Sequence, residues 1–478
     1  MTDYNRFYIG GDWVAPAGTN SYDVVSPHSG EVLAKVPQST PADMDAAVSA
    51  ARRAFDEGPW PQRTPAERAE AVDRLAALFA ERGDEFNQLI TDQMGSPITG
   101  GQMVQVMPAH QTYEYYAGLG RSHAVEEERA GMLGPVIVRR EPVGVVAAVV
   151  AWNVPQFLIA TKLAPALIAG CTVVVKPAPE SPLDSYLLAE LVAEAGIPEG
   201  VVNIVPGGRE VGEHLVSHPQ VDKVAFTGST AAGNRVAEIC GRQSKRYSLE
   251  LGGKSAAILL DDADLEASLP MLKMFAVMNN GQACVAQSRV LAPRSRYDEI
   301  VGALGETLDS MVVGDPNDPS TEIGPLAAER QVERVEGYVR TGKEEGAKLV
   351  TGGGPRPFDR GCYVSPTLFA DVDNSMRIAR EEIFGPVLSV IPYTDEDEAV
   401  RIANDSDYGL AGTVWTADVD HGIDIARRVR TGTYGVNIYN IDICAPFGGY
   451  KSSGVGRELG PEGLENYLES KSIVTPAR

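Results

Sequence analysis

The sequence predicts a mixed α/β protein with two doubly wound α/β domains and a projecting β arm. Apolar runs of strand length alternate with helical stretches, and this rhythm starts again after about residue 250. The chain has 478 residues, about three times the roughly 150 residues of a typical domain. It is therefore long enough to bury more than one core.

Four apolar runs predict the strands of the first sheet: residues 143–151, 171–175, 201–205 and 221–226. Helical stretches separate them, the first at residues 156–169. Continuous runs of β-branched residues are typical of parallel strands that are buried on both faces. Strands that alternate with helices in this way favour a doubly wound sheet.

The second sheet is predicted from a new series of short apolar segments. A helix at residues 271–279 follows the first of them. The segments are AAILL (256–260), SRVLAP (288–293), GPVLSVIPY (385–393), AGTVWT (411–416) and YGVNIY (434–439). A second α/β domain explains this restart better than a continuation of the first sheet does.

Two flanking features lie outside the sheets. Between residues 41 and 86 the sequence is Ala-rich and helical, and Thr64, Pro65 and Glu67 fit the N-cap, N1 and N3 positions of a helix. Residues 126–142 are charged and precede the first buried strand, with no obvious partner strand close in sequence. We interpret them as a β arm whose edge pairs with another subunit.

Composition excludes several classes of function. The chain has 42 basic and 65 acidic residues and a net charge of −23, so nucleic acid and anionic membrane surfaces are not expected partners. The longest apolar run, residues 143–152, is shorter than the roughly 20 residues of a membrane helix. The opening MTDYNRFYIGGDWV lacks the pattern of an export signal. We expect a cytoplasmic protein.

No metal site or disulfide framework is predicted. The five cysteines are widely spaced and form no CxxC pair. His214 and His218 stand four residues apart but lack the glutamate of the HExxH zinc motif. A surface helix explains this pair.

Two apparent phosphate motifs fail on their spacing. Residues 252–255 (GGKS) resemble the end of a Walker A loop, but Ser248 stands where its first glycine belongs. Residues 454–456 (GVG) resemble the start of a dinucleotide fingerprint, but Leu459 stands where its third glycine belongs.

A better candidate for phosphate binding is FTGST (226–230), which joins a buried strand to a helical stretch. Gly228 and Ser229 would lie at a helix N-terminus, where free N–H groups favour an anion. Lys176 ends a predicted parallel strand, at the sheet edge where α/β proteins bind ligands. An ordinary strand-to-helix turn is the alternative.

Three polar residues in unusual surroundings are candidates for chemistry. Cys284 lies among amides and glycine in NNGQACVAQSR, although a buried structural thiol is the alternative. Glu250 ends an apolar run in SLELGGK, where burial would raise its pKa toward that of a general base, or where it could form a salt bridge. Asn153 in AWNVP could stabilise an oxyanion or cap the helix that follows.

Taken together, these motifs resemble those of the aldehyde dehydrogenase superfamily, whose members oxidise aldehydes to acids with NAD(P). The resemblance spans nearly the whole chain and keeps the order of the motifs. The motifs are AWNVP (151–155), VVVKPAPESP (173–182), FTGST (226–230), LELGGKS (249–255), GQAC (281–284), EEIFGPV (381–387) and PFGGYKSSGVGRE (446–458).

The resemblance implies a catalytic role for three residues. Cys284 is the nucleophile that attacks the aldehyde carbon, and its backbone N–H stabilises the oxyanion together with the side chain of Asn153. Glu250 activates the water that hydrolyses the resulting thioester. No metal takes part in this scheme.

The resemblance also implies the coenzyme contacts and the division of the chain. Lys176 holds the adenosine ribose and Glu382 the nicotinamide ribose, while Phe384, Trp152, Gly228 and Ser229 line the coenzyme cleft. The implied domains are a Rossmann-like dinucleotide-binding domain (1–123 and 144–251), a catalytic domain (252–450), and an oligomerisation arm and tail (124–143 and 466–478). A homodimer or homotetramer is expected, with arm and tail strands pairing between subunits.

Departures from the family pattern bear on coenzyme and substrate. NAD is the predicted coenzyme, but Pro179 stands where many NAD-preferring members carry glutamate, so NADP stays open. Val154, Met278 and Ile441 are aliphatic, and the stretches 154–161 and 437–446 are short of basic residues that could bind a substrate carboxylate, Lys162 being the nearest. This favours an apolar aldehyde: aliphatic, terpenoid or aromatic.

Two other functions are possible for a chain with these motifs. In a coenzyme A-acylating relative, coenzyme A instead of water releases the thioester, but such members generally lack the base at the position of Glu250. A non-catalytic binding protein on the same fold is disfavoured because Cys284, Asn153, Glu250 and Glu382 are all present.

Overall fold

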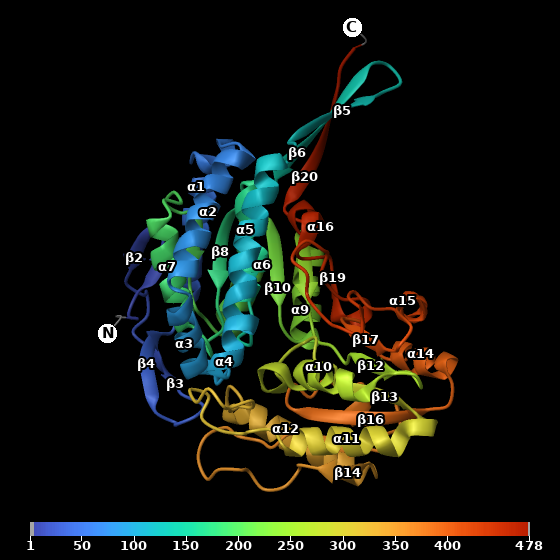
Figure 1. The fold of residues 1–478 in the computed structure, drawn as a ribbon. Helices are drawn as coiled ribbons and strands as arrows, with labels where there is room; N and C mark the ends of the chain where they lie inside the picture. The colour runs from blue at the N-terminus through green and yellow to red at the C-terminus, as the bar shows by residue number, and fades with distance from the viewer. Residues whose placement is uncertain (1–3, 477–478) are drawn as a thin grey trace.

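The computed structural model describes residues 4–476, so residues 1–3 and 477–478 of the predicted domain ranges lie outside the described residues. Figure 1 shows two α/β bodies, one coloured blue to green and the other yellow to orange, and an arm that projects from the first. The predicted mixed α/β fold with two doubly wound sheets is confirmed.

The first sheet has eight strands in the order β19-β11-β10-β7-β8-β9-β1-β2. Its five central strands are parallel. The four predicted apolar runs form four of them, β7, β8, β9 and β10, and helices cover both faces. The strands are β1 (Phe7–Ile9), β2 (Asp12–Val14), β7 (Val145–Val149), β8 (Thr172–Lys176), β9 (Val202–Ile204), β10 (Lys223–Thr227), β11 (Arg246–Glu250) and β19 (Gly454–Val455).

Helices pack on both faces of this sheet (Figure 1). One face is covered by α1 (Pro41–Asp56), α8 (Arg209–Ser217) and α9 (Thr230–Arg242). The other is covered by α2 (Pro65–Glu81), α5 (Met107–Ser122), α6 (Pro155–Ala169) and α7 (Leu183–Glu194), with α3 (Gly83–Met94) and α4 (Ile98–Gly101) at its edge. The predicted cap of α2 is present: Glu67 N–H donates to Thr64 Oγ1 and Thr64 N–H to Glu67 Oε2.

The second sheet has seven strands in the order β14-β15-β16-β13-β12-β17-β18. All its pairs are parallel except β14 with β15. The strands are β12 (Ala256–Leu259), β13 (Arg289–Pro293), β14 (Lys348–Thr351), β15 (Thr367–Ala370), β16 (Val387–Tyr393), β17 (Gly412–Trp415) and β18 (Gly435–Val436). Its helices are α10 (Leu265–Val277), α11 (Tyr297–Asp309), α12 (Glu329–Glu344), α13 (Arg377–Arg380), α14 (Glu396–Asn404) and α15 (Val419–Arg428).

Two predicted segments of this body have other bounds than expected: the helix begins earlier, at Leu265, and each segment ends earlier. The helix predicted at 271–279 ends at Val277, because Asn279 and Asn280 both adopt left-handed backbone angles, with φ of 51° and 61°. The strand predicted at 434–439 pairs only over Gly435–Val436.

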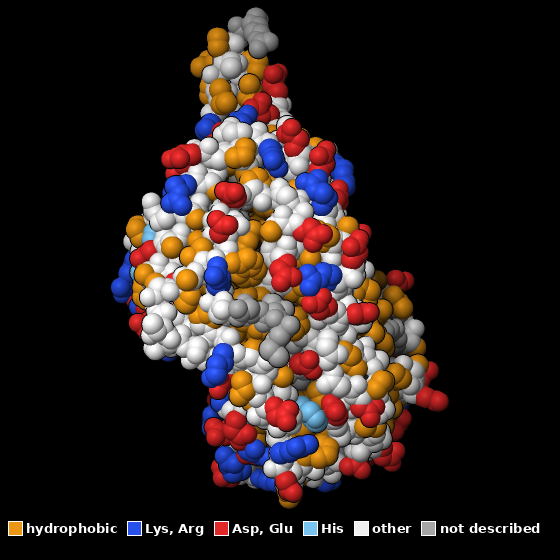
Figure 2. All heavy atoms as spheres, turned by 90° about the vertical axis from the view of Figure 1, so that its left-hand side faces the viewer, with side chains coloured by type: hydrophobic (Ala, Val, Ile, Leu, Met, Phe, Trp, Pro, Cys, Tyr) orange, Lys and Arg blue, Asp and Glu red, His pale blue; other side chains and the backbone are white. Residues whose placement is uncertain are grey.

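The arm is a three-stranded antiparallel sheet of β5 (Glu126–Ala130), β6 (Pro135–Pro142) and β20 (Leu468–Val474). The partner of the arm lies far away in sequence: the tail strand β20 of the same chain pairs with β6, from Leu468 opposite Pro142 to Val474 opposite Val136. The free edges are those of β5 and β20. Figure 2 shows hydrophobic side chains near the end of the arm, where Met132 and Leu133 are exposed.

The remaining elements are short. They are the pair β3 (Ser21–Val25) and β4 (Val32–Pro37), the turns η1 (Trp60–Gln62), η2 (Gln102–Val106), η3 (Met278–Gly281), η4 (Arg294–Arg296) and η5 (Lys451–Ser453), and α16 (Gly460–Glu465). Among residues 4–476, no helix combines the length and the apolar character that crossing a membrane requires.

Candidate active site

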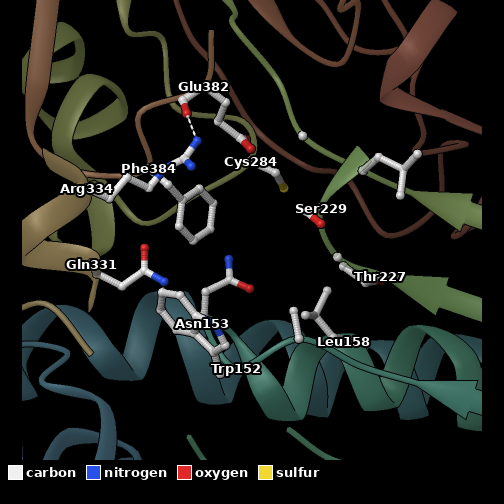
Figure 3. A pocket seen from close by; sticks show the side chains of 14 residues that line it. Trp152, Asn153, Leu158, Thr227, Ser229, Cys284, Gln331, Arg334, Glu382 and Phe384 are labelled. Carbon is white, nitrogen blue, oxygen red and sulfur yellow. Dashed lines mark hydrogen bonds between the residues drawn. The ribbon is translucent and has the colours of Figure 1, made fainter. Parts of the chain in front are cut away.

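A cavity of about 800 Å³, open to solvent, lies between the two bodies. One wall is formed by the segments that follow β7, β10 and β11, at the carboxyl edge of the first sheet, and the other by Cys284 and segments of the second body. Figure 3 shows Asn153 and Cys284 directed into the same space from opposite walls. Seven of the predicted residues line this cavity: Trp152, Asn153, Gly228, Ser229, Cys284, Glu382 and Phe384. Their roles stay predictions.

Cys284 lies in the loop that the left-handed residues Asn279 and Asn280 create after α10. Burial raises the pKa of the Cys284 thiol to about 12, and the carboxylates of Glu382 and Glu250 add to this effect. The two charged groups that act most on the thiol are therefore carboxylates and not cations. Because the thiol holds its proton in this setting, a base is needed to make it nucleophilic.

Glu250 is the last residue of β11 and is buried outside the lining of the cavity, and its charge acts on the Cys284 thiol. Burial raises its pKa well above the usual range, and the charge of Glu458 adds to the rise, whereas Lys162 and Arg457 oppose it. Its Oε2 atom has no hydrogen-bond partner among residues 4–476. A buried carboxylate with a raised pKa and a free oxygen suits a general base.

A buried ion pair behind Glu250 was missed by the sequence reasoning. Lys162 Nζ lies 2.7 Å from Glu458 Oε1 and donates to Thr227 Oγ1 at 2.7 Å. Lys162 was considered only as a possible contact for a substrate carboxylate. Its place in a helical stretch that is otherwise apolar is the signal that could have indicated a buried partner.

Asn153 does not cap the helix that follows it, which was the alternative to a role in oxyanion binding. The N-cap of α6 is Val154, which makes no side-chain cap. The Asn153 amide instead donates to the Gln282 carbonyl oxygen at 3.0 Å. A primary amide has two N–H donors, so one anchors Asn153 to the Cys284 loop while the other is available to a ligand in the cavity.

Glu382 and Phe384 form the opposite end of the cavity. Gly253 N–H donates to Glu382 Oε1 at 2.9 Å, and burial raises the pKa of the Glu382 carboxyl to about 6. A Cβ on Gly252 would lie 2.5 Å from Glu382 Oε2, which explains the glycine. Phe384 has a left-handed φ of 63° and meets Trp152 edge to face, with ring centroids 5.5 Å apart.

The turn from β10 into α9 adopts the predicted geometry. Ser229 is the N-cap of α9, and its Oγ accepts from Ala232 N–H at 3.3 Å. A Cβ on Gly228 would lie 2.6 Å from the Phe226 ring, so only glycine fits there. The turn presents backbone N–H groups of a 13-residue helix to the cavity, which suits the phosphates of a dinucleotide.

Lys176 lies at the end of β8 but not in the lining of the main cavity. Its Nζ donates to the carbonyl oxygens of Pro177, at 3.1 Å, and Gly207, and burial lowers its pKa to about 8. Glu180, displaced by one position from the family's glutamate, forms an ion pair with Arg330. Glu180 is therefore paired with Arg330, while its charge still opposes the lowering of the Lys176 pKa.

Gln331 and Arg334, on α12, are cavity residues that the sequence reasoning did not identify. Arg334 donates to the Glu382 carbonyl oxygen (dashed in Figure 3). Both lie on an amphipathic helix whose sequence looks like an ordinary surface helix, so no local signal distinguishes them.

Several aliphatic side chains belong to the same core region as Cys284. Val154, Met274, Met278, Ile441 and Ile443 are partly buried hydrophobic residues that pack against the same core cluster as the Cys284 side chain. Lys162, the basic residue nearest in sequence, is turned away into its pair with Glu458. Aliphatic side chains of this kind suit an apolar ligand.

Other candidate groups stay outside the site. His214 on α8 lies 2.6 Å from Asp45 Oδ1, and His218 lies 3.5 Å from the same oxygen. Among residues 4–476, no group of three or more His, Cys, Asp or Glu is placed to hold a metal. The five cysteines form no disulfide in the described part of the chain.

Comparisons with known proteins agree with this arrangement. A family model described as "Aldehyde dehydrogenase family" matches residues 13–473. Geranial dehydrogenase of Castellaniella defragrans is 50% identical over 472 residues, which cover 98% of each chain.

Two solved structures have nearly the same fold as this chain. An aldehyde dehydrogenase of Mycobacterium tuberculosis, complexed with NAD+, is 52% identical with a TM-score of 0.98, covering 99% of both chains. A mutant aldehyde dehydrogenase C of Pseudomonas syringae, complexed with NAD+ and octanal, is 43% identical with a TM-score of 0.96, covering 99% of this chain and 98% of that one.

Proposed function

The chain belongs to the aldehyde dehydrogenase family, and we propose that it oxidises an apolar aldehyde to the carboxylic acid with NAD as coenzyme. The observation that carries this proposal is the placement of Cys284 in one cavity with the Asn153 amide, beside the buried Glu250 carboxylate. A nucleophile, an oxyanion donor and a base are the groups that thioester chemistry requires.

The first half of the reaction is thioester formation. The Cys284 thiol gives its proton to Glu250, and its sulfur attacks the aldehyde carbon. The carbonyl oxygen becomes an oxyanion, which accepts from the second N–H of Asn153 and the backbone N–H of Cys284. The coenzyme supplies the hydride acceptor when bound, and the carbon held on Cys284 is then at the level of a thioester.

The second half is hydrolysis. Glu250 first releases to solvent the proton that it took from Cys284, and then takes a proton from a water molecule, whose oxygen attacks the thioester carbon. The carbon–sulfur bond breaks, the acid leaves, and the Cys284 sulfur takes the proton back from Glu250. Glu250 Oε2 is buried and has no hydrogen-bond partner among residues 4–476, so it would be the oxygen that accepts the proton of the water. Burial has the largest effect on the pKa of Glu250, and the charges of Glu458 and Lys162 then shift this pKa in opposite directions.

The dinucleotide fits the residues present. The Gly228–Ser229 turn would hold its phosphates, Glu382 the nicotinamide ribose, Lys176 the adenosine ribose, and Trp152 and Phe384 flank the cleft. The cavity lining and the glycine at position 228 support this assignment. NAD is favoured because two similar solved proteins are NAD+ complexes, although Pro179 lacks the carboxylate that would repel a 2′-phosphate.

We infer that the substrate is an apolar aldehyde of medium length. The aliphatic side chains of Val154, Met278 and Ile441 support this class. Two similar proteins point the same way: one is named a geranial dehydrogenase and the other was solved with octanal. The coenzyme A-acylating alternative is disfavoured because Glu250 is present and buried as a base.

Assembly and location follow from the same features. The free edges of β5 and β20, with exposed Met132 and Leu133, support a homodimer or homotetramer built through the arm. The five unpaired cysteines in the described residues fit the cytoplasm.

The proposal is tested by NADH absorbance with purified protein, NAD or NADP, and an aldehyde panel of octanal, geranial, benzaldehyde and succinic semialdehyde. We expect turnover of the apolar aldehydes with NAD, and none from Cys284→Ser. Preference for succinic semialdehyde would contradict the substrate class. Turnover that requires added coenzyme A would establish the acylating alternative.

A further inference from the structure

A buried glutamine outside every motif lies behind the oxyanion donor. Gln105 is completely buried and belongs to η2 (Gln102–Val106), a π-helical turn between α4 and α5. Met107 N–H donates to the Gln102 carbonyl oxygen, five residues back. Such turns in helices often mark functional sites.

The chain itself explains the wide turn. Pro108, two residues after the turn, has no N–H, and in a regular α-helix its ring would clash with the carbonyl of Val104. The π-helical turn relieves this conflict. It leaves Gln102 on the outside, where its Nε2 donates to Asp84 Oδ1 at 2.7 Å, and turns Gln105 inward.

Gln105 uses its amide group on the active site. Its Nε2 donates to the Asn153 carbonyl oxygen at 3.0 Å and to Asn279 Oδ1 at 3.3 Å. The Asn279 amide donates to the same Asn153 oxygen at 2.9 Å and to the Gln282 carbonyl oxygen at 3.2 Å. The Gln282 oxygen also accepts from the Asn153 side chain.

Three amides thus converge on two carbonyl oxygens. We propose that Gln105 is a positioning residue, which through Asn279 holds the Asn153 amide in the orientation that stabilises the oxyanion on Cys284. This inference rests on the proposed function. Gln105 and Asn279 both donate to the backbone carbonyl oxygen of Asn153. They thereby fix the backbone of Asn153 and with it the direction of its side chain.

The chemistry of the group is specific. A carboxylate at position 105 would set negative oxygens against the two acceptor oxygens that Gln105 Nε2 now serves. A methionine would keep the volume and lose both donors. A residue that merely filled space would tolerate either change, whereas a positioning amide would not.

The test compares two glutamines of one turn, as Gln105→Met and Gln102→Met. With NAD and octanal in rapid mixing, we expect Gln105→Met to slow the first turnover of NADH about 10- to 100-fold, the effect of a small misplacement of a catalytic group. Gln102→Met should keep the wild-type rate. Alkylation of Cys284 by iodoacetamide involves no oxyanion and should proceed at the wild-type rate in both variants.

Each other result has a definite meaning. Equal slowing of alkylation and of the first turnover would overturn the inference, because Gln105 would then hold the thiol loop and not the oxyanion donor. An unchanged first turnover would also overturn it. If Gln105→Met does not fold, Gln105→Glu, which matches the size of glutamine, is measured in its place with the same expected result.

The wild-type protein separates this inference from the proposed function. Without NADH formation in wild-type protein and Gln102→Met, the proposed function fails and the inference falls with it. With both active beside an unaffected Gln105→Met, the inference alone is overturned.

Discussion

The two sides of the Cys284 thiol are built from different kinds of side chain. On one side lie charged groups: Glu250, with the Lys162–Glu458 pair behind it. On the other side lie neutral amides: Asn153 held by Asn279, with Gln282 supplying the shared carbonyl oxygen. The charged side gains and loses protons, and the amide side does not.

This difference assigns the two sides to different tasks. A base must change its protonation state during the reaction, so its pKa has to lie within reach of the working pH. An oxyanion donor must keep one orientation, so groups that do not titrate suit it better. Changes on the charged side should therefore alter the pH dependence of the rate, and changes on the amide side should lower the rate at every pH.

The largest effect is expected from Glu250→Gln. Steady-state turnover should fall about 10²- to 10⁴-fold, because no base activates the water. The first turnover of NADH should persist as a slower burst, because the thiol loses the base that takes its proton but also loses one of the two carboxylates that raise its pKa. Stopped-flow absorbance measures both phases. An unchanged steady-state rate would remove Glu250 from this role.

The next effect is expected from Asn153→Ala. Loss of the oxyanion donor should slow the burst itself about 10²- to 10³-fold. Because no titratable group is removed, the curve of rate against pH should keep its shape and move only downward. The measurement is the burst rate over a range of pH. A shift of the acid limb along the pH axis would show that the amide side also affects the protonation of Glu250, contrary to the division proposed above.

How far the sequence predicts this site depends on the distance over which its parts are assembled. The turn at Gly228 and Ser229 and the end of β11 at Glu250 are contiguous pieces of chain, and each has a local signal: a glycine, a cap, or a polar residue after an apolar run. The predicted family, fold and enzyme class are confirmed for this reason.

The parts that sequence reasoning missed are joined across long stretches of chain. Gln105 meets Asn279 across 174 residues. Arg334 comes from a helix with an ordinary surface pattern, and β20 pairs with β6 in the arm of its own chain. Such contacts are set by the packing of whole elements, and no spacing within a single motif reports them.

The smallest effect on the maximal rate is expected from changes to the Lys162–Glu458 ion pair. These changes test most directly whether the charged side of Cys284 controls the pH dependence. The ionised form of Glu250 is the active base, so activity is lost as the pH falls through its raised pKa. Lys162→Met removes a charge that lowers this pKa and should move the acid limb to higher pH. Glu458→Gln removes a charge that raises it and should move the limb to lower pH.

The double variant is the matched control for these two changes. Each single change leaves one buried charge unpaired, which costs about 3–5 kcal/mol of stability, so both single variants should unfold at lower temperature than the double variant. Removal of both charges should return the acid limb toward its wild-type position, because their opposite effects on Glu250 are removed together. The measurements are kcat against pH and thermal unfolding of all four proteins. If the acid limb moved in the same direction in both single variants, the roles given to the two charges would be contradicted. Loss of stability does not predict opposite shifts of the limb, whereas the opposite charges of Lys162 and Glu458 do.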